Sequence, residues 1–206
     1  MSHHPRELSR RRLLYLAGAA ARLAAAEPDF WDAKPPDEWS VADIYQLVNR
    51  SPWAKPVHGF LRPTPRAPDV APRGRAPVPD IVGPSGVVTW ESSQPVRDAL
   101  KTPLPGAFAD CYVLGVDGIP LGTASVDDLK ESAALRSSGK VRWTVRAQAV
   151  LELIRTSPVY ALGFPRAAAP IGLDSVEIVF EVQFGRWLVE ARFDPRKMLY
   201  HGQLAV

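Results

Sequence analysis

A run of alternating apolar residues between positions 175 and 193 constrains the fold more than any other part of the chain. Apolar side chains recur at every second position on both sides of Gly185-Arg186, and this period of two is typical of β-strands. Glycine in the first position of a two-residue loop favours a type II′ hairpin turn. The cross-strand pairs that this turn predicts are Phe184–Trp187, Val182–Val189, Phe180–Ala191 and Ile178–Phe193. One face of the hairpin is therefore apolar, and the rest of the chain must cover it.

The remainder of the region 85–206 carries both strand and helix patterns. Strands are expected at 87–90, 111–116, 141–145, 159–164 and 198–206. Helices are expected from Pro95, from Ser125 to Gly139 and from Ala147 to Ile154. Hairpins outnumber strand–helix–strand units, so the predicted fold is α+β with a mainly antiparallel sheet, a prominent C-terminal hairpin and two or three helices.

The first 26 residues have the pattern of an export signal. Arg10 and Arg11 form a twin-arginine pair, a short apolar run follows, and an Ala-x-Ala sequence predicts cleavage after Ala26. The run is about half of the roughly 20 apolar residues that a membrane-spanning helix needs. We therefore expect export to the periplasm or the cell exterior through the translocation machinery, without a stable membrane anchor. The general secretion route, or a basic arm on a cytosolic chain, is the alternative.

Residues 27–55 are rich in aromatic side chains around one short helix. Ser40 and Asp43 have the spacing of a capping box, which predicts a helix start. Trp31, Trp39 and Trp53 flank this helix and are the candidate binding residues, because exposed tryptophans can hold a sugar or a partner protein. The alternative is that they pack the segment onto the later domain, or onto a neighbouring copy in a homo-oligomer.

Residues 56–84 contain eight prolines in 29 positions, which favours an extended polyproline conformation over a packed core. We expect a linker or a strap between the 27–55 segment and the domain at 85–206.

The sequences FWDAKPPDEW, SPWAK, FPR and FDPRKMLYHGQL occur near the two ends of the region after the signal. With these motifs the chain resembles a family of uncharacterised exported proteins of acidobacterial type. The resemblance implies export and a shared fold, and it implies no particular activity.

Charge and cysteine content exclude two classes of function. The sequence pI of about 9.2 arises from the arginines of the signal, because residues 27–206 have 20 basic and 21 acidic residues. Nucleic acid is therefore not an expected partner. Cys111 is the only cysteine, which excludes an intramolecular disulfide and a Cys-x-x-Cys zinc site. Neither a metal nor a cofactor is expected.

The hairpin register suggests one acid–base pair. Glu181 faces Glu190 across the strands, with β-carbons about 5 Å apart. Two carboxylates at that distance form the candidate catalytic pair of a hydrolase, although Arg192 lies diagonally and can neutralise them. Structural, solvent-screened glutamates are the alternative.

Other catalytic patterns are weaker. Cys111 with His58 or His201 as base is a nucleophile hypothesis, but its apolar neighbours favour a buried, inert thiol. The glycines between 115 and 122 lack the spacing of a phosphate-binding loop. The sequence as a whole favours a non-catalytic exported module that binds a protein, envelope or carbohydrate partner, with a periplasmic hydrolase as the alternative.

Overall fold

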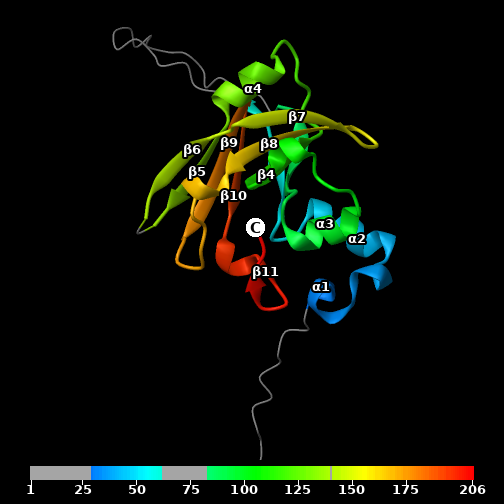
Figure 1. Ribbon diagram of the computed structural model, residues 1–206. Coiled ribbons are helices and arrows are strands. Elements are labelled where there is room, and N and C mark those ends of the chain that lie inside the picture. The colour runs from blue at the N-terminus through cyan, green and yellow to red at the C-terminus, as the bar shows by residue number, and fades with distance from the viewer. Residues whose placement is uncertain (1–28, 62–82, 140) are drawn as a thin grey trace, which may run out of the picture.

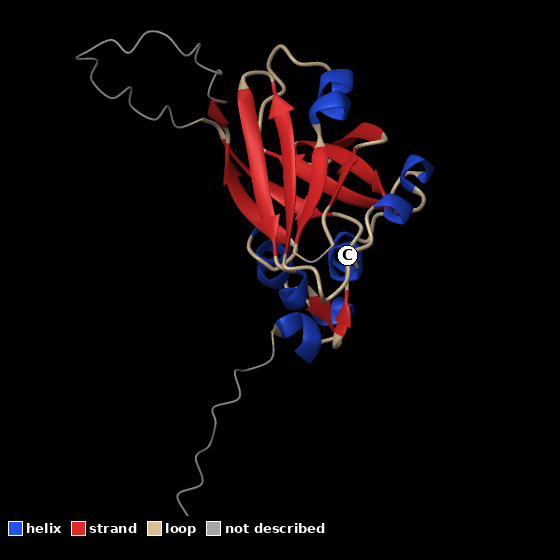
Figure 2. Cartoon of the chain, turned by 90° about the vertical axis from the view of Figure 1, so that its left-hand side faces the viewer, coloured by secondary structure: helices blue, strands red, loops and turns tan. Residues whose placement is uncertain are grey.

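Residues 29–61, 83–139 and 141–206 are described by the computed structural model, and strands dominate them. Two five-stranded antiparallel sheets pack against each other, with four α-helices around them in the described ranges (Figures 1 and 2). This confirms the predicted α+β class with mainly antiparallel pairing. The signal residues Arg10, Arg11 and Ala26 lie outside the described residues.

The two sheets are joined by the chain at both edges. Sheet A has the strand order β1-β3-β4-β8-β7 and sheet B has the order β2-β10-β9-β5-β6. Only Gly59 separates β1 from β2, and Ala147-Gln148 separate β6 from β7. The strands of sheet A are β1 (Ala54–His58), β3 (Ser85–Trp90), β4 (Cys111–Asp117), β8 (Pro158–Pro165) and β7 (Ala149–Ile154). Those of sheet B are β2 (Phe60–Leu61), β10 (Trp187–Phe193), β9 (Glu177–Phe184), β5 (Ala134–Ser138) and β6 (Trp143–Arg146).

Helices lie at opposite ends of the sheets. Figure 1 shows α4 at the upper end, and α1 at the lower end beside the small hairpin of β11 and β12. The helices are α1 (Phe30–Ala33), α2 (Val41–Asn49), α3 (Gln94–Leu100) and α4 (Val126–Ser132), and the small strands are β11 (Leu199–Tyr200) and β12 (Gln203–Leu204). Single 3-10 turns occur at Pro36–Glu38, Gly106–Phe108, Arg166–Ala168 and Pro195–Lys197.

The β9–β10 hairpin has the predicted register, with Phe184 opposite Trp187 and Ile178 opposite Phe193. Gly185 has a positive φ of 55°, as the first residue of a type II′ turn requires, and Arg186 does not. The apolar face of the β9–β10 hairpin packs against sheet A through edge-to-face ring contacts. The ring centroids of Trp90 and Phe193 are 5.2 Å apart, those of Tyr160 and Phe184 5.6 Å, and those of Phe164 and Phe180 6.0 Å. Sheet A is therefore what covers the hairpin.

The aromatic N-terminal segment belongs to the same core. Trp31, Trp39 and Trp53 are 4%, 6% and 0% exposed and share one hydrophobic cluster with both sheets. The indole nitrogen of Trp53 donates to the carbonyl oxygen of Ala205 at 2.7 Å. The structure thus places this segment against its own chain, which is the packing alternative of the sequence analysis.

The expected linker at 56–84 differs from the structure at both ends. β1 runs across the boundary at residue 56 and pairs with β3, so that His58 lies opposite Ser85. The amide of Gly59 donates to Pro84, and that of Gly83 donates to Gly59, at 2.8 and 3.1 Å. Gly59 and Gly83 therefore lie side by side. Residues 62–82 of the proline-rich stretch, which follow β2 and precede β3 in the chain, lie outside the described residues.

Two helix predictions were wrong. The helix expected to reach Gly139 ends at Ser132, because Ala133 is extended (φ −70°, ψ 130°) and the chain continues as β5. The helix expected from Ala147 is the strand β7, whose Val150 faces the core between the sheets while Leu151 and Leu153 pack on the other side of sheet A.

The start of α4 gives a pH prediction. Asp128 accepts hydrogen bonds from the backbone N–H and the hydroxyl of Ser125, and these bonds lower the pKa of Asp128. A carboxyl group whose pKa is lower in the folded state contributes stability above the unfolded pKa of about 3.9, and this contribution is lost as the pH falls through the folded pKa. We expect Ser125→Ala to return the pKa of Asp128 toward its ordinary value, as measured by carboxyl NMR titration. An unchanged pKa would contradict the capping geometry.

Candidate functional site

The predicted glutamate pair is formed, but each carboxylate has an arginine of its own. Glu181 lies opposite Glu190 in the β9–β10 register. Arg136 of β5 binds Glu181 at 2.8 Å, and Arg192 binds Glu190 at 2.7 Å and Glu177 at 2.9 Å. The hydrogen bond and the charge of Glu190 raise the pKa of Arg192. This pattern is that of ion pairs on a solvent-facing sheet surface.

The other predicted groups do not assemble into a catalytic site. Cys111 is buried, and its sulfur accepts a hydrogen bond from the side chain of Gln148 at 3.0 Å. His58 makes a cross-strand hydrogen bond with Ser85, and His201 lies beside Asp32 at the β11–β12 turn. The buried Trp31, Trp39 and Trp53 offer no exposed platform for a sugar ring.

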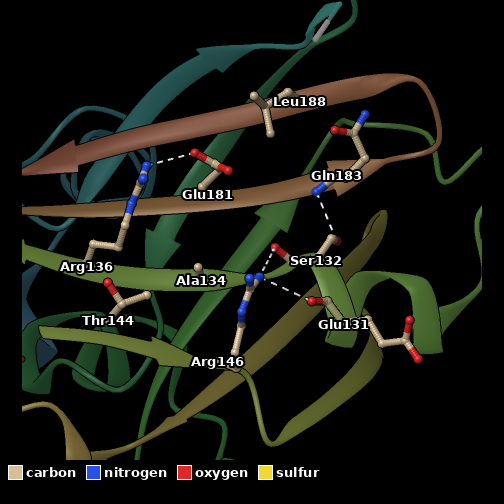
Figure 3. Close-up of a pocket in the computed structure, with 9 residues that line it drawn as sticks. All are labelled: Glu131, Ser132, Ala134, Arg136, Thr144, Arg146, Glu181, Gln183 and Leu188. Atoms are coloured by element: carbon tan, nitrogen blue, oxygen red, sulfur yellow. Dashed lines mark hydrogen bonds and ion pairs between the residues drawn. The ribbon is translucent and has the colours of Figure 1, made fainter. Parts of the chain in front are cut away.

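A polar hollow of about 480 Å³ lies on the outer face of sheet B, where the glutamate Glu181 also lies. Figure 3 shows its lining side chains, which come from four strands and from the end of α4. The lining residues are Glu131, Ser132, Ala134, Arg136, Thr144, Arg146, Glu181, Gln183 and Leu188.

The pairing of the strands explains why this face is hollow. Ala134 of β5 lies between Arg146 of β6 and Glu181 of β9, since it is paired with both. A methyl side chain in the middle row leaves a depression between long neighbours. In the next row Arg136 is opposite Thr144. Ala134 therefore forms the floor, and longer polar side chains form the walls.

Arg146 is held at one wall by the end of a helix. Its Nη1 donates to the carbonyl oxygens of Glu131 and Ser132, at 3.3 and 3.2 Å, at the C-terminal end of α4 (Figure 3). Carbonyls at a helix C-terminus lack partners within the helix and attract a cation. Among the described residues, Nε and Nη2 of Arg146 have no hydrogen-bond partner, so this guanidinium retains donors for a ligand.

Gln183 supplies an acceptor that the fold does not use. Its Nε2 donates to the carbonyl of Gly185 at 2.9 Å, and its backbone N–H donates to the hydroxyl of Ser132 at 3.2 Å. The bond to Gly185 fixes the side-chain amide and identifies which end of it is nitrogen. Oε1 is buried and, among the described residues, has no hydrogen-bond partner. A buried unpaired acceptor costs about 1–3 kcal/mol, and because Oε1 is closed off from the surface, it does not face the hollow.

A second hollow of about 450 Å³ adjoins the first. Both are lined by Glu131, Ser132 and Gln183, so together they form one groove along the end of α4. The second hollow continues to Thr123, Ala124, Asp128 and Gly185.

The first hollow has charges of both signs and closely spaced donors and acceptors. Arg136 and Arg146 line it together with the carboxylate of Glu181, and Thr144 adds a hydroxyl, whereas the Glu131 carboxylate points away (Figure 3). A hydroxyl group of a ligand both donates and accepts, so a neutral polyhydroxylated molecule matches this lining better than a simple anion or cation. Sequence reasoning singled out only Glu181 here. The signal available in the sequence was that Arg136, Thr144 and Arg146 occupy alternate positions of short strands. That signal does not indicate that α4 and β9 lie beside these strands.

The described residues give no support for a metal site or for a membrane-spanning helix. Within residues 29–61, 83–139 and 141–206, no group of three or more histidine, cysteine, aspartate or glutamate side chains could hold a metal ion. No helix in the same ranges is long and apolar enough to cross a bilayer.

Comparison of the chain with models of known protein families, with curated proteins and with solved structures gives no match.

Proposed function

We propose that this chain is an exported, non-catalytic binding module, and that the hollow on the outer face of sheet B binds a neutral carbohydrate of the cell envelope. The observation that carries the proposal is the lining of the hollow: two arginines, the carboxylate of Glu181 and the hydroxyl of Thr144 line it around the small floor at Ala134. Sugars are recognised by such dense sets of donors and acceptors.

The ion pairs favour binding over hydrolysis. General acid catalysis by a glutamate needs a carboxyl group that stays protonated near neutral pH. The carboxylates of Glu181 and Glu190 are engaged in ion pairs with Arg136 and Arg192, at 2.8 and 2.7 Å. The competing hypothesis is a periplasmic hydrolase that uses this pair, and the binding experiment below distinguishes the two.

Filling the floor of the hollow tests the proposal. Ala134→Met places a longer apolar side chain between Arg146 and Glu181 without removing any polar group. We expect the variant to bind an N-acetylglucosamine oligosaccharide at least about tenfold more weakly than the natural chain by calorimetry, a loss of roughly 1.4 kcal/mol.

The matched control is Arg192→Ala, which removes an arginine from the same face but outside the hollow. It should leave the affinity unchanged. Equal binding by Ala134→Met and the natural chain would contradict the site. Turnover of the glycan that disappears in Glu181→Gln and Glu190→Gln would instead support the hydrolase.

Export is tested by the mass of the chain recovered from the producing cells. A chain that begins at Glu27 is the expected result of cleavage after Ala26. A chain that retains Met1 and stays in the cytoplasm would contradict export while leaving the hollow on sheet B intact.

A further inference from the structure

A separate hollow of about 550 Å³, the sheet A hollow, lies on the outer face of sheet A, between the loop that follows α3 and the end of β7. None of the residues that line the two hollows on sheet B lines it. Leu104 and Leu153 form part of its wall and pack against the small apolar cluster of Phe108 and Val113. Both leucines are only half-buried, so an apolar ligand that covers them removes apolar surface from water.

Most charges at the sheet A hollow are paired or turned away. Arg155 donates to both carboxylate oxygens of Glu91, at 3.0 and 2.8 Å, so these two charges neutralise each other. Glu152 is paired with Tyr160, whose ring contacts that of Phe184 in sheet B. Because directly paired residues share one face of a sheet, the Glu152 side chain lies on the inner side of sheet A, away from the leucines.

Arg97 of α3 is the charge that remains. It lines the sheet A hollow and is exposed, and among the described residues its guanidinium has neither a hydrogen bond nor an ion pair. A guanidinium offers a planar set of donors that matches the two oxygens of a carboxylate. One unpaired cation beside an apolar wall is complementary to a ligand with a carboxylate at one end and an apolar chain at the other.

We propose that the sheet A hollow binds an acyl carboxylate of medium chain length. The chain lies on Leu104 and Leu153, and Arg97 holds the carboxylate. A small inorganic anion leaves the leucine wall in water, and a neutral acyl compound gains nothing from the charge of Arg97. This site is independent of the carbohydrate site on sheet B, since the two share no residue.

NMR titration of the full isotope-labelled chain with octanoate, octanamide and butanoate tests the two parts of the ligand separately. Octanoate should shift the methyl signals of Leu104 and Leu153. We expect it to bind about fivefold more tightly than octanamide, as for one hydrogen bond to a charged group, and at least about tenfold more tightly than butanoate, which lacks most of the apolar chain. Arg97→Met should reduce the preference for octanoate over octanamide toward one and leave the affinity for octanamide within about twofold.

Arg142→Met is the matched control, because Arg142 is also exposed and without a partner among the described residues but does not line the hollow. It should keep the preference for octanoate. Leu104→Ser should weaken binding of both octanoate and octanamide, whereas Leu173→Ser, at a leucine that is 54% exposed on another loop, should weaken neither. Equal affinities for octanoate and octanamide, a preference that survives in Arg97→Met, or shifts centred away from Leu104 and Leu153 would each overturn the proposal.

Discussion

Replacement of Trp53 by alanine is expected to lower the free energy of unfolding by about 3–5 kcal/mol. Trp53 is fully buried, its ring meets that of Trp31 edge to face with centroids 5.4 Å apart, and its backbone oxygen accepts from the amide of Trp90. The substitution leaves a large cavity where the N-terminal segment joins both sheets. It also leaves the carbonyl of Ala205 without its indole donor.

Urea denaturation of the purified chain measures this effect, and Tyr45→Ala is the matched control. Tyr45 is an aromatic residue of the same segment but is 65% exposed, so its loss should change stability by less than about 0.5 kcal/mol. If Trp53→Ala were as mild as Tyr45→Ala, the packing of the N-terminal segment into the core would be contradicted.

The buried ion pair of sheet A gives the second large effect. The two terminal guanidinium nitrogens of Arg155, Nη1 and Nη2, donate to Glu91 at 3.0 and 2.8 Å, and the Glu91 side chain is only 2% exposed. Gly115 of β4 leaves room for this carboxylate, since a Cβ there would lie 2.6 Å from Glu91 Oε1. Arg155→Ala leaves a buried charge without a partner, and we expect a loss of about 3 kcal/mol in urea denaturation.

Double substitution separates the charge from the packing. Glu91→Gln with Arg155→Met removes both charges, and it should be less destabilising than Arg155→Ala because no charge stays buried. Arg196→Ala disrupts an exposed ion pair with Asp194 and should have little effect. A double variant as unstable as Arg155→Ala would show that packing of the Arg155 side chain, and not its charge, is what matters.

The hairpin at β9–β10 was predictable because its signals are local. A period of two and Gly185 in the turn determine both the strands and their register. The capping boxes at Ser40 and Ser125 are equally local, and both are formed. The ends of α4 and the nature of β7 were not predictable in this way. The apolar spacing of Ala147, Val150 and Ile154 imitates a helix. The strand β7 instead packs Val150 between the sheets and Leu151 and Leu153 on the other face of sheet A, and it leaves Ile154 exposed.

The candidate site depends on contacts between distant parts of the chain. Arg136 meets Glu181 across 45 residues, and the amide of Gln183 meets Ser132 across 51. Pattern reasoning placed Glu181 opposite Glu190, which share one hairpin. It could not supply Arg136 as the partner of Glu181 or Ala134 as a floor, because the pairing of β5 with β9 is not encoded in any local motif.

The most direct test of carbohydrate binding on sheet B is an NMR titration of the isotope-labelled chain with the N-acetylglucosamine oligosaccharide. We expect the largest shift changes at the side-chain amide of Gln183, the methyl group of Ala134 and the guanidinium of Arg146, all in the first hollow. Signals of Glu190 and Arg192 on the same face should move little. Changes centred on another surface, or none at saturating glycan, would contradict the site.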